Sequence, residues 1–313
     1  MNGHDEAPAL HARILELEAE LQSTRAQLNT VEGSDSKGMT EIQGNGRLAA
    51  FSMPTSLSLD LSIHNLMLLS DSALPLGSFA YSSGLESFLA HHKASGTKET
   101  NLSLFHKFLK LSIQSMAYTN IPYALAAYRD PTRLPDLDND LDASTPCNVA
   151  RRASVAQGRA LLSVWERAFS ATAKQGQKDH DLAEVATTAL DLFSRDLKIS
   201  SITTAAMEIP SANGHFAPLW GTVCLALHLS LADAGYVFLL NHAKAVVSAA
   251  VRASVMGPYM AQSVLASKGF QELIRECLQR VWWSSTEEAG QVVPMLDLWI
   301  GRHELLYSRI FNS

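Results

Sequence analysis

The sequence predicts an all-α fold, a multi-helix bundle of about ten helices with an N-terminal helical arm. Apolar side chains recur at helical spacing through most of the chain after residue 59, and no segment shows strand alternation bounded by hairpin signals. Of the 313 residues, 47% are hydrophobic and 18% are charged, which is enough apolar material for a sizeable core. We therefore expect helices that each bury one apolar face.

Helical periodicity is clearest in residues 240–257. There Val247 and Val251 lie on an apolar stripe, Arg252 lies on another face, and Pro258 ends the pattern. The same spacing predicts helices over residues 61–69, 102–116, 149–169, 182–193 and 270–283.

The first 58 residues are predicted to form an arm and a linker. Residues 10–31 space their apolar side chains alternately by four and three, as in a short coiled-coil seam, although a lone and partly populated helix remains an alternative. Residues 32–58 are rich in glycine and small polar residues and predict a flexible linker. We therefore divide the chain into a helical arm (1–31), a linker (32–58) and a helical domain (59–313).

Two further segments need interpretation. Residues 220–240 are apolar enough to imitate a membrane span, but they contain His228 and Asp233, which are costly inside a bilayer, so we predict buried helix. Residues 130–147 contain three prolines and alternating aspartates and are predicted to form a solvated acidic loop. Its aspartates imitate a calcium loop, but Leu141 replaces the required glycine and Cys147 the required glutamate.

Charge and cysteine content exclude several classes of function. The formal net charge of -6 gives no electrostatic footprint for nucleic acid or an anionic membrane. Cys147, Cys224 and Cys277 are far apart and form no CxxC pair, so neither a disulfide framework nor a zinc site is expected. Without an apolar signal region at its start, the chain is expected to be cytoplasmic, with proteins or small molecules as its partners.

No motif for catalysis, cofactor binding or metal binding is present. The glycines at Gly33 and Gly38 are followed by Met39 instead of the P-loop lysine, and there is no HExxH. The pair His91 and His92 falls at an expected helix end, where capping is a better interpretation than a nickel site. We expect no catalytic, cofactor or metal residues.

One candidate nucleophile is Ser82, because Ala80-Tyr81-Ser82-Ser83-Gly84 resembles the GxSxG elbow of hydrolases. An elbow requires a preceding strand, whereas this segment follows a loop, so Ser82 or Ser83 is expected near a helix N-cap. A serine hydrolase remains an alternative, and it predicts a basic partner such as His106 or His215 within hydrogen-bond reach of the Ser82 hydroxyl.

Three segments of the sequence match the pattern of one protein family. The first, residues 68–86 (LLSDSALPLGSFAYSSGLE), is close to the family pattern SPALPxGxFxYSxGLE. The second, residues 151–162 (RRASVAQGRALL), is similar to its RxxSxxxGRALL helix. The third, residues 294–311, contains PMLD, RHE and YSRIF and is similar to the family tail. Together the three segments resemble the UreF family of urease accessory proteins. The arm, the long acidic loop and Ser78 depart from the bacterial pattern and suggest a eukaryotic member, fungal or plant.

The resemblance implies an adaptor without its own active site. Members are all-helical, dimerise, bind the UreD or UreH accessory protein, recruit the GTPase UreG and deliver nickel to apo-urease. The resemblance therefore implies a homodimer with these partners and no stably bound cofactor, nickel being handled by the complex. It also implies that the following residues bind partners: Pro75, Gly77, Phe79, Tyr81, Glu86, Arg152, Arg159, Asp297, Arg302, His303, Glu304, Tyr307, Ser308, Arg309 and Phe311.

Residue chemistry leaves alternatives open at several of these positions. Pro75 and Gly77 are expected to set a turn, and Phe79 is expected in the core. Tyr81 suits either the core or an interface. The apolar tail, residues 298–311, suits either a partner or the chain's own core, and the resemblance favours a partner.

The arginines of the motifs have two interpretations. Arg152 and Arg159 are seven residues apart on one helix face, where a solvated stripe is expected more than a contact with the GTPase. A second hypothesis for function is that Arg152 or Arg309 regulates GTP hydrolysis by the partner.

Overall fold

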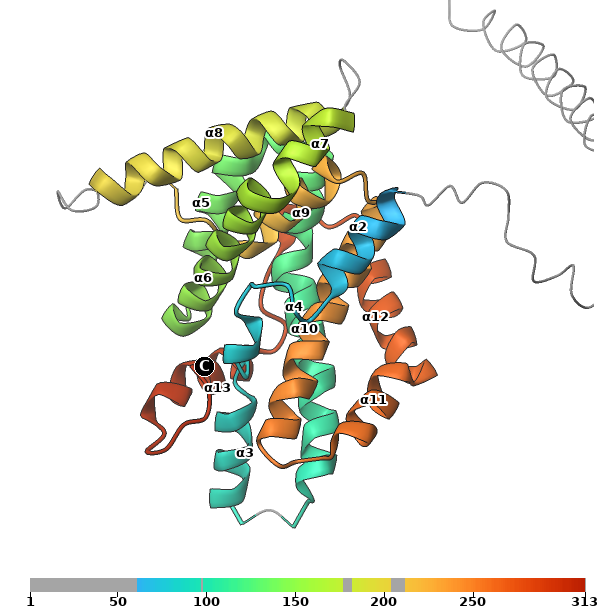
Figure 1. Cartoon of the computed structure of the whole chain (residues 1–313). Coiled ribbons are helices and arrows are strands. Elements are labelled where there is room, and N and C mark those ends of the chain that lie inside the picture. Colours follow the sequence, from blue (N-terminus) through green and yellow to red (C-terminus); the bar gives the residue numbers. More distant parts are fainter. Residues whose placement is uncertain (1–60, 97, 177–181, 204–211, 313) are drawn as a thin grey trace, which may run out of the picture. The chain divides into compact units, whose positions relative to one another are not determined.

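The computed structural model describes residues 61–96, 98–176, 182–203 and 212–312 (Figure 1). The chain divides into two units, Met1–Ser58 and Leu59–Ser313, and only the second contains described residues. The predicted coiled-coil arm and linker therefore lie outside the described residues.

Every regular element in the described ranges is helical, which confirms the predicted all-α class. Short 3-10 turns are found at Ser78–Ala80, Pro131–Arg133, Thr286–Glu288 and His303–Leu305, and a π-helical turn at Trp165–Phe169. The α-helices are α2 (Leu61–Ser70), α3 (Leu85–Ala94), α4 (Asn101–Arg129), α5 (Leu134–Ser144), α6 (Asn148–Val164), α7 (Ser170–Gly176), α8 (Leu182–Thr203), α9 (Phe216–Ala226), α10 (Leu231–Arg252), α11 (Pro258–Ala266), α12 (Lys268–Val281) and α13 (Pro294–Arg302).

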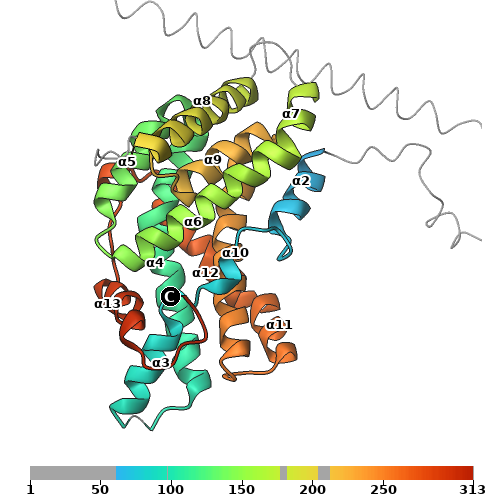
Figure 2. The same cartoon turned by 60° about the vertical axis from the view of Figure 1, so that its left-hand side comes forward.

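Helices α4 and α10 run through the centre of the bundle (Figures 1 and 2). Helix α4 packs against α9, α10 and α12, and α10 also packs against α2 and α11. The long α8 lies over α9, while α13 packs against α3 and α6. The C-terminal helix therefore lies beside elements from the first half of the chain.

Helix α9 is buried from Ala217 to Ala226 and packs closely against α4. A Cβ atom on Gly221 would lie 1.9 Å from the Ala124 carbonyl oxygen of α4, so no side chain fits at this crossing. Absence of a Cβ lets the two backbones approach, which is why glycine is required there.

The predicted buried helix over residues 220–240 is wrong as a single element. Helix α9 ends at Ala226 and α10 begins at Leu231, and His228 between them adopts a left-handed conformation with φ of 59°. The Ser230 side chain accepts the backbone N–H of Asp233 and caps the new helix. The helix is interrupted between α9 and α10 because Ser230 caps a new helix. The apolar composition of the segment gives no indication of this cap.

The helix predicted over residues 240–257 corresponds to α10. This helix begins earlier than predicted, at Leu231, and ends earlier, at Arg252. In the described part of the chain it is the one helix long and apolar enough to cross a membrane by length and composition, and 56% of its most apolar window is buried within the protein. A buried core helix meets the same criteria, and α10 occupies a central place in the bundle.

The predicted solvated loop over residues 130–147 is also wrong, since most of it is helical. Pro131 begins a 3-10 turn and Pro135 lies in the first turn of α5, where a proline costs no backbone hydrogen bond. Leu134, Leu137 and Leu141 are spaced by three and four residues and form its buried face. The aspartates of this segment are consequently held in defined positions.

Candidate functional site

The first motif forms a tight loop that receives the C-terminal helix. Gly77 and Gly84 both adopt positive φ angles, of 70° and 89°, which glycine tolerates best. A Cβ on Gly84 would lie 3.0 Å from Cγ1 of Ile300 and 3.2 Å from its backbone nitrogen. The loop between α2 and α3 is thus shaped to let α13 pack against it.

Glu86 joins the first motif to the third. Its Oε2 atom lies 2.8 Å from Nε2 of His303, and its Oε1 atom accepts the backbone N–H of Ile310 at 2.9 Å. The His303 ring is fully buried, and its Nδ1 has no hydrogen-bond partner within the described ranges. A single carboxylate therefore holds two points of the tail.

The end of the tail is fixed by Phe311. This side chain is buried, with the Arg252 guanidinium 4.4 Å from the ring centroid, and Arg252 also donates to the Phe79 carbonyl. The backbone N–H of Asn312 donates to the Ala80 carbonyl at 2.8 Å. The tail thus folds onto its own core through these anchors, as one of the two alternatives predicted.

Other side chains of the same tail stay exposed. Leu305, Tyr307 and Ile310 are 81%, 107% and 60% exposed, and Leu298 on α13 is 51% exposed. Ser308 and Arg309 are also exposed. The tail therefore combines buried anchors with a solvent-facing apolar surface.

The second motif organises the start of α9. The Ser154 hydroxyl accepts the Phe216 N–H at 3.3 Å and lies 3.0 Å from Nδ1 of His215. A Cβ on Gly158 would lie 2.1 Å from the Gly214 carbonyl oxygen, so α6 approaches this turn closely. Serine and glycine in this motif thus have an internal structural role.

Arg159 and Arg152 engage different parts of the chain. Arg159 Nε donates to the Asn213 carbonyl at 2.8 Å, next to the same turn. Arg152 forms an ion pair with Glu304, which joins the second motif to the third. Both arginines are exposed, so the predicted solvated stripe describes their surroundings although each has a partner.

Asp138 is a structural residue that the sequence interpretation missed. Its buried carboxylate accepts the backbone N–H groups of Asn213, Gly214 and His215 at 2.6 to 3.1 Å. The neighbouring Asp142 Oδ1 atom lies 3.1 Å from Nε2 of His215. The leucine spacing of α5, which indicates a buried helical face, is the sequence signal that places these acids on a helix.

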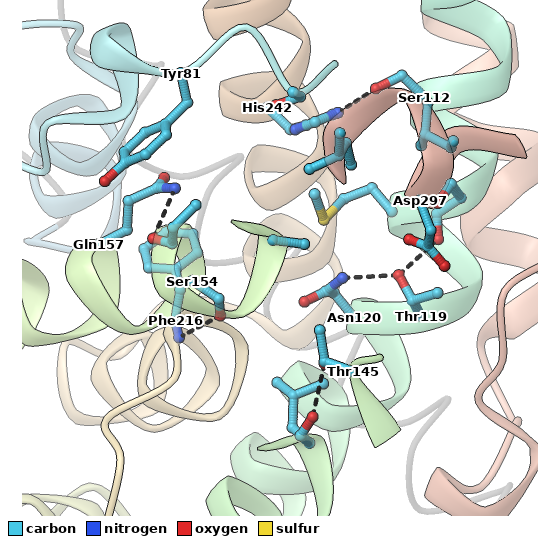
Figure 3. Close-up of a pocket in the computed structure, with 18 of the residues that line it drawn as sticks. Tyr81, Ser112, Thr119, Asn120, Thr145, Ser154, Gln157, Phe216, His242 and Asp297 are labelled. Atoms are coloured by element: carbon cyan, nitrogen blue, oxygen red, sulfur yellow. Dashed lines mark hydrogen bonds between the residues drawn. The ribbon is translucent and has the colours of Figure 1, made fainter. Parts of the chain in front are cut away.

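A cavity of about 180 Å³ lies where the three motif segments meet (Figure 3). Tyr81 from the first motif, Gln157 from the second and Asp297 from the third line it, together with residues of α4 and α10. Burial raises the pKa of Asp297, an effect that a hydrogen bond from Gln291 partly offsets. Asp297 is therefore an internal cavity residue in this chain.

His242 also lines this cavity and is paired with Ser112. Its Nε2 atom lies 2.8 Å from the Ser112 hydroxyl (Figure 3). Desolvation by the surrounding protein lowers the pKa of His242 to about 4, so the ring is neutral at pH 7.

Two predictions for residues of the first motif have clear outcomes. Phe79 was expected in the core, but it is 65% exposed, because the turn at Gly77 directs it outward and Leu76 is buried instead. Helix α3 begins at Leu85, and the Ser82 hydroxyl accepts the Glu86 N–H at 3.4 Å, near the N-cap as expected.

The serine hydrolase alternative gains no support from His215. Both ring nitrogens of His215 are engaged, Nδ1 with Ser154 and Nε2 with Asp142. The ring of the other candidate base, His106, lies 5.7 Å from that of Phe105 on α4. The geometry thus commits His215 to holding the start of α9.

His91 and His92 lie in the last turn of α3, as expected. Their Nδ1 atoms are 2.7 Å from the Ser87 carbonyl and 2.9 Å from the Phe88 carbonyl, and Arg302 approaches His91 Nε2 at 3.4 Å. Within the described ranges no group of three or more His, Cys, Asp or Glu side chains is arranged to hold a metal ion. The three cysteines are buried and unpaired.

Comparison with known proteins gives consistent matches. The UreF family model matches residues 100–268. A relative in Schizosaccharomyces pombe, described as an uncharacterized urease accessory protein UreF-like, is 37% identical over 250 residues, covering 80% of this chain and 97% of the relative. Urease accessory protein 6 of Cryptococcus neoformans is 26% identical, with 80% and 97% covered, and urease accessory protein F of Arabidopsis thaliana is 27% identical, with 78% and 89% covered.

The described residues form an all-α bundle in which the three motif segments meet at one junction. The chain belongs to the UreF family of urease accessory proteins, with relatives in fungi and plants, as the three motifs predicted.

Replacing Glu86 by glutamine should loosen the tail, because an amide has one acceptor oxygen where the carboxylate uses two. We expect a loss of about 1 to 3 kcal/mol in the free energy of unfolding, with faster hydrogen exchange over residues 303–312, measured by mass spectrometry. The control is Glu272→Gln, whose exposed pair with Lys268 spans 3.7 Å. Unchanged exchange in E86Q would show that Glu86 does not hold the tail.

Acid should destabilise the protein through His242. The folded-state pKa of about 4 is below the ordinary value of 6.5, so the unfolded chain binds a proton first as the pH falls. Stability is then complete above pH 6.5 and falls by up to about 3 kcal/mol as the pH approaches 4. Urea unfolding across this range should give a flatter profile for H242Q than for the wild type or the exposed control H64Q. Equal profiles would contradict this assignment.

Proposed function

We propose that this protein is a non-catalytic adaptor that promotes nickel insertion into apo-urease together with a UreD/UreH-type accessory protein and a UreG-type GTPase. The observation that carries the proposal is the C-terminal segment, which is anchored yet presents apolar side chains to solvent. Membership of the UreF family supports a role in urease maturation, since its members are named urease accessory proteins.

The tail is suited to docking because its conformation is organised before a partner arrives. His303 and Phe311 are buried and hold the backbone, while Leu305 and Tyr307 remain almost completely exposed. Large exposed apolar side chains on an ordered segment are typical of interface hot spots, because little conformational entropy is lost when they are covered. A folded tail and a partner-binding tail are therefore compatible.

Charged side chains surround these apolar residues. Arg302 and Glu304 are exposed near α13, and the Arg152 pair orients Glu304. Arg309 follows Tyr307 and is exposed as well. Polar groups at the rim of an apolar patch set register and partner choice more than affinity.

The remaining properties of the adaptor follow from the same proposal. It acts in the cytoplasm as a homodimer, holds no stable cofactor and leaves nickel handling to the assembled complex. Its net charge of -6 supports protein partners over nucleic acid or an anionic membrane.

Cells lacking this gene should contain urease protein that is inactive and poor in nickel. Urease activity, urease protein and nickel per urease subunit are measured in cells with and without the gene. Fully active urease with a normal nickel content in the deletion strain would contradict the proposed function.

Substitutions on the exposed tail should reproduce this defect in part. Tyr307→Ala and Leu305→Asp are expected to lower urease activity by about tenfold or more, because exposed anchors of this kind carry much of an interface's binding energy. Tyr259→Ala, at a 90% exposed position on α11, is the matched control. Normal activity in both tail variants, with normal protein levels, would place the docking surface elsewhere.

A second candidate function is regulation of the partner GTPase by Arg309. Arg152 is already paired with Glu304, whereas Arg309 is exposed and makes no ion pair within the described ranges. An exposed arginine of this kind can stabilise the transition state of phosphoryl transfer. Arg309→Ala should then lower GTP hydrolysis in the assembled complex by about tenfold or more, with Arg280→Ala as control. Equal hydrolysis rates would leave the scaffold as the sole role.

A further inference from the structure

The cavity between the three motif segments is separate from the exposed tail, because Leu305 and Tyr307 do not line it. It has a volume of about 180 Å³ and is lined by residues of α4, α6, α10 and α13 and of the first-motif loop. An apolar cavity of about 150 Å³ is large enough to hold benzene. The space therefore suits a small organic molecule.

The amide side chains around the cavity have fixed orientations. Asn241 donates its NH₂ group to the Leu69 carbonyl, and Gln157 donates to the Ala153 carbonyl, which can only accept. Asn120 donates to the Thr119 hydroxyl, whose own hydrogen goes to the Ser115 carbonyl. Reversing any of these amides would place two acceptors against each other.

Each of these amides leaves its carbonyl oxygen available as an acceptor, and one N–H of its NH₂ group as a donor. The amide oxygens of Asn120, Asn241 and Gln157 have no hydrogen-bond partner in the described part of the chain. Oδ2 of Asp297 is also left, since Gln291 donates to Oδ1. Figure 3 shows that Asn120, Gln157 and Asp297 come from separate helices around the cavity. These accessible oxygens are suited to a ligand that donates hydrogen bonds.

The charge of the side chains that line the cavity indicates the charge of its ligand. Asp297 is the acidic side chain of the lining, and no lysine or arginine accompanies it among the described residues. His242 remains neutral at pH 7 and contributes no positive charge. An anion would meet acceptors and a carboxylate with no cation to balance them.

We propose that this cavity binds a small organic cation carrying several N–H donors, of the alkylammonium or alkylguanidinium class, with Asp297 as its counter-ion. The amide oxygens of Asn120, Asn241 and Gln157 accept its remaining hydrogens. Such a ligand pairs with oxygens that accept no hydrogen bond from the described part of the chain.

Aromatic rings and apolar side chains complete the site. Tyr81, Phe216 and Phe238 line the cavity, and the two phenylalanine rings stack with centroids 5.4 Å apart. Aromatic faces attract cations, and the surrounding alanine and leucine side chains accommodate a short alkyl chain. A divalent metal ion fits less well, because the cavity offers one carboxylate and no cluster of metal ligands within the described residues.

The test uses the full chain and isothermal titration calorimetry with three probes of similar size: n-butylammonium, 1-pentanol and pentanoate. We expect saturable binding of n-butylammonium at one site per chain and no saturable binding of the alcohol or the carboxylate. Methylguanidinium, the second cationic probe, should compete with n-butylammonium. Equal binding of the alcohol, or no saturable binding of either cation, would overturn the proposal.

Two variants locate the binding at this cavity. Asp297→Asn should weaken n-butylammonium binding about tenfold or more, because it removes the charge and preserves the shape. Asp140→Asn, at an exposed position on α5, is the matched control and should have no effect. Gln157→Glu adds a carboxylate to the lining and should tighten binding, which keeps the test decisive if D297N fails to fold. Unchanged affinity in a folded D297N or in Q157E would overturn the proposal.

Discussion

The buried carboxylate of Asp138 is the interaction on which the rest of the helical domain depends. It accepts three consecutive backbone N–H groups, from Asn213 to His215, immediately before α9. A buried charge is tolerated when its lone pairs are occupied in this way. Because α9 is buried along its length and packs against α4, α6 and α8, fixing its first turn positions those helices too.

A second set of polar contacts organises the three motif segments. Glu86 holds His303 and the backbone of Ile310, while Ser154 supports the turn before α9. Some motif residues thus organise the chain, whereas others, such as Tyr307, remain exposed. The motifs therefore contain both residues that stabilise the fold and residues that are exposed, and the burial of each side chain distinguishes the two groups. The buried residues hold the exposed ones in place.

Where the sequence interpretation went wrong, a local signal competed with packing. Prolines and aspartates in residues 130–147 resemble a loop, yet prolines are acceptable in a first helical turn and the leucine spacing prevails. Phe79 resembles a core residue, but the left-handed backbone at Gly77 turns it outward. In residues 220–240, apolar composition concealed the cap at Ser230. Packing of the leucine face decided the outcome in residues 130–147, and the local backbone conformation decided it in the other two segments.

By itself the sequence determined the helical class and the family, because apolar periodicity and motif patterns are properties of neighbouring residues. Only the tertiary structure decided that Glu86 meets His303, that Asp138 reaches the start of α9, and that Asp297 faces a cavity. The first two are contacts across 217 and 76 residues of sequence. Such pairings depend on how whole helices pack, and no local spacing encodes that arrangement.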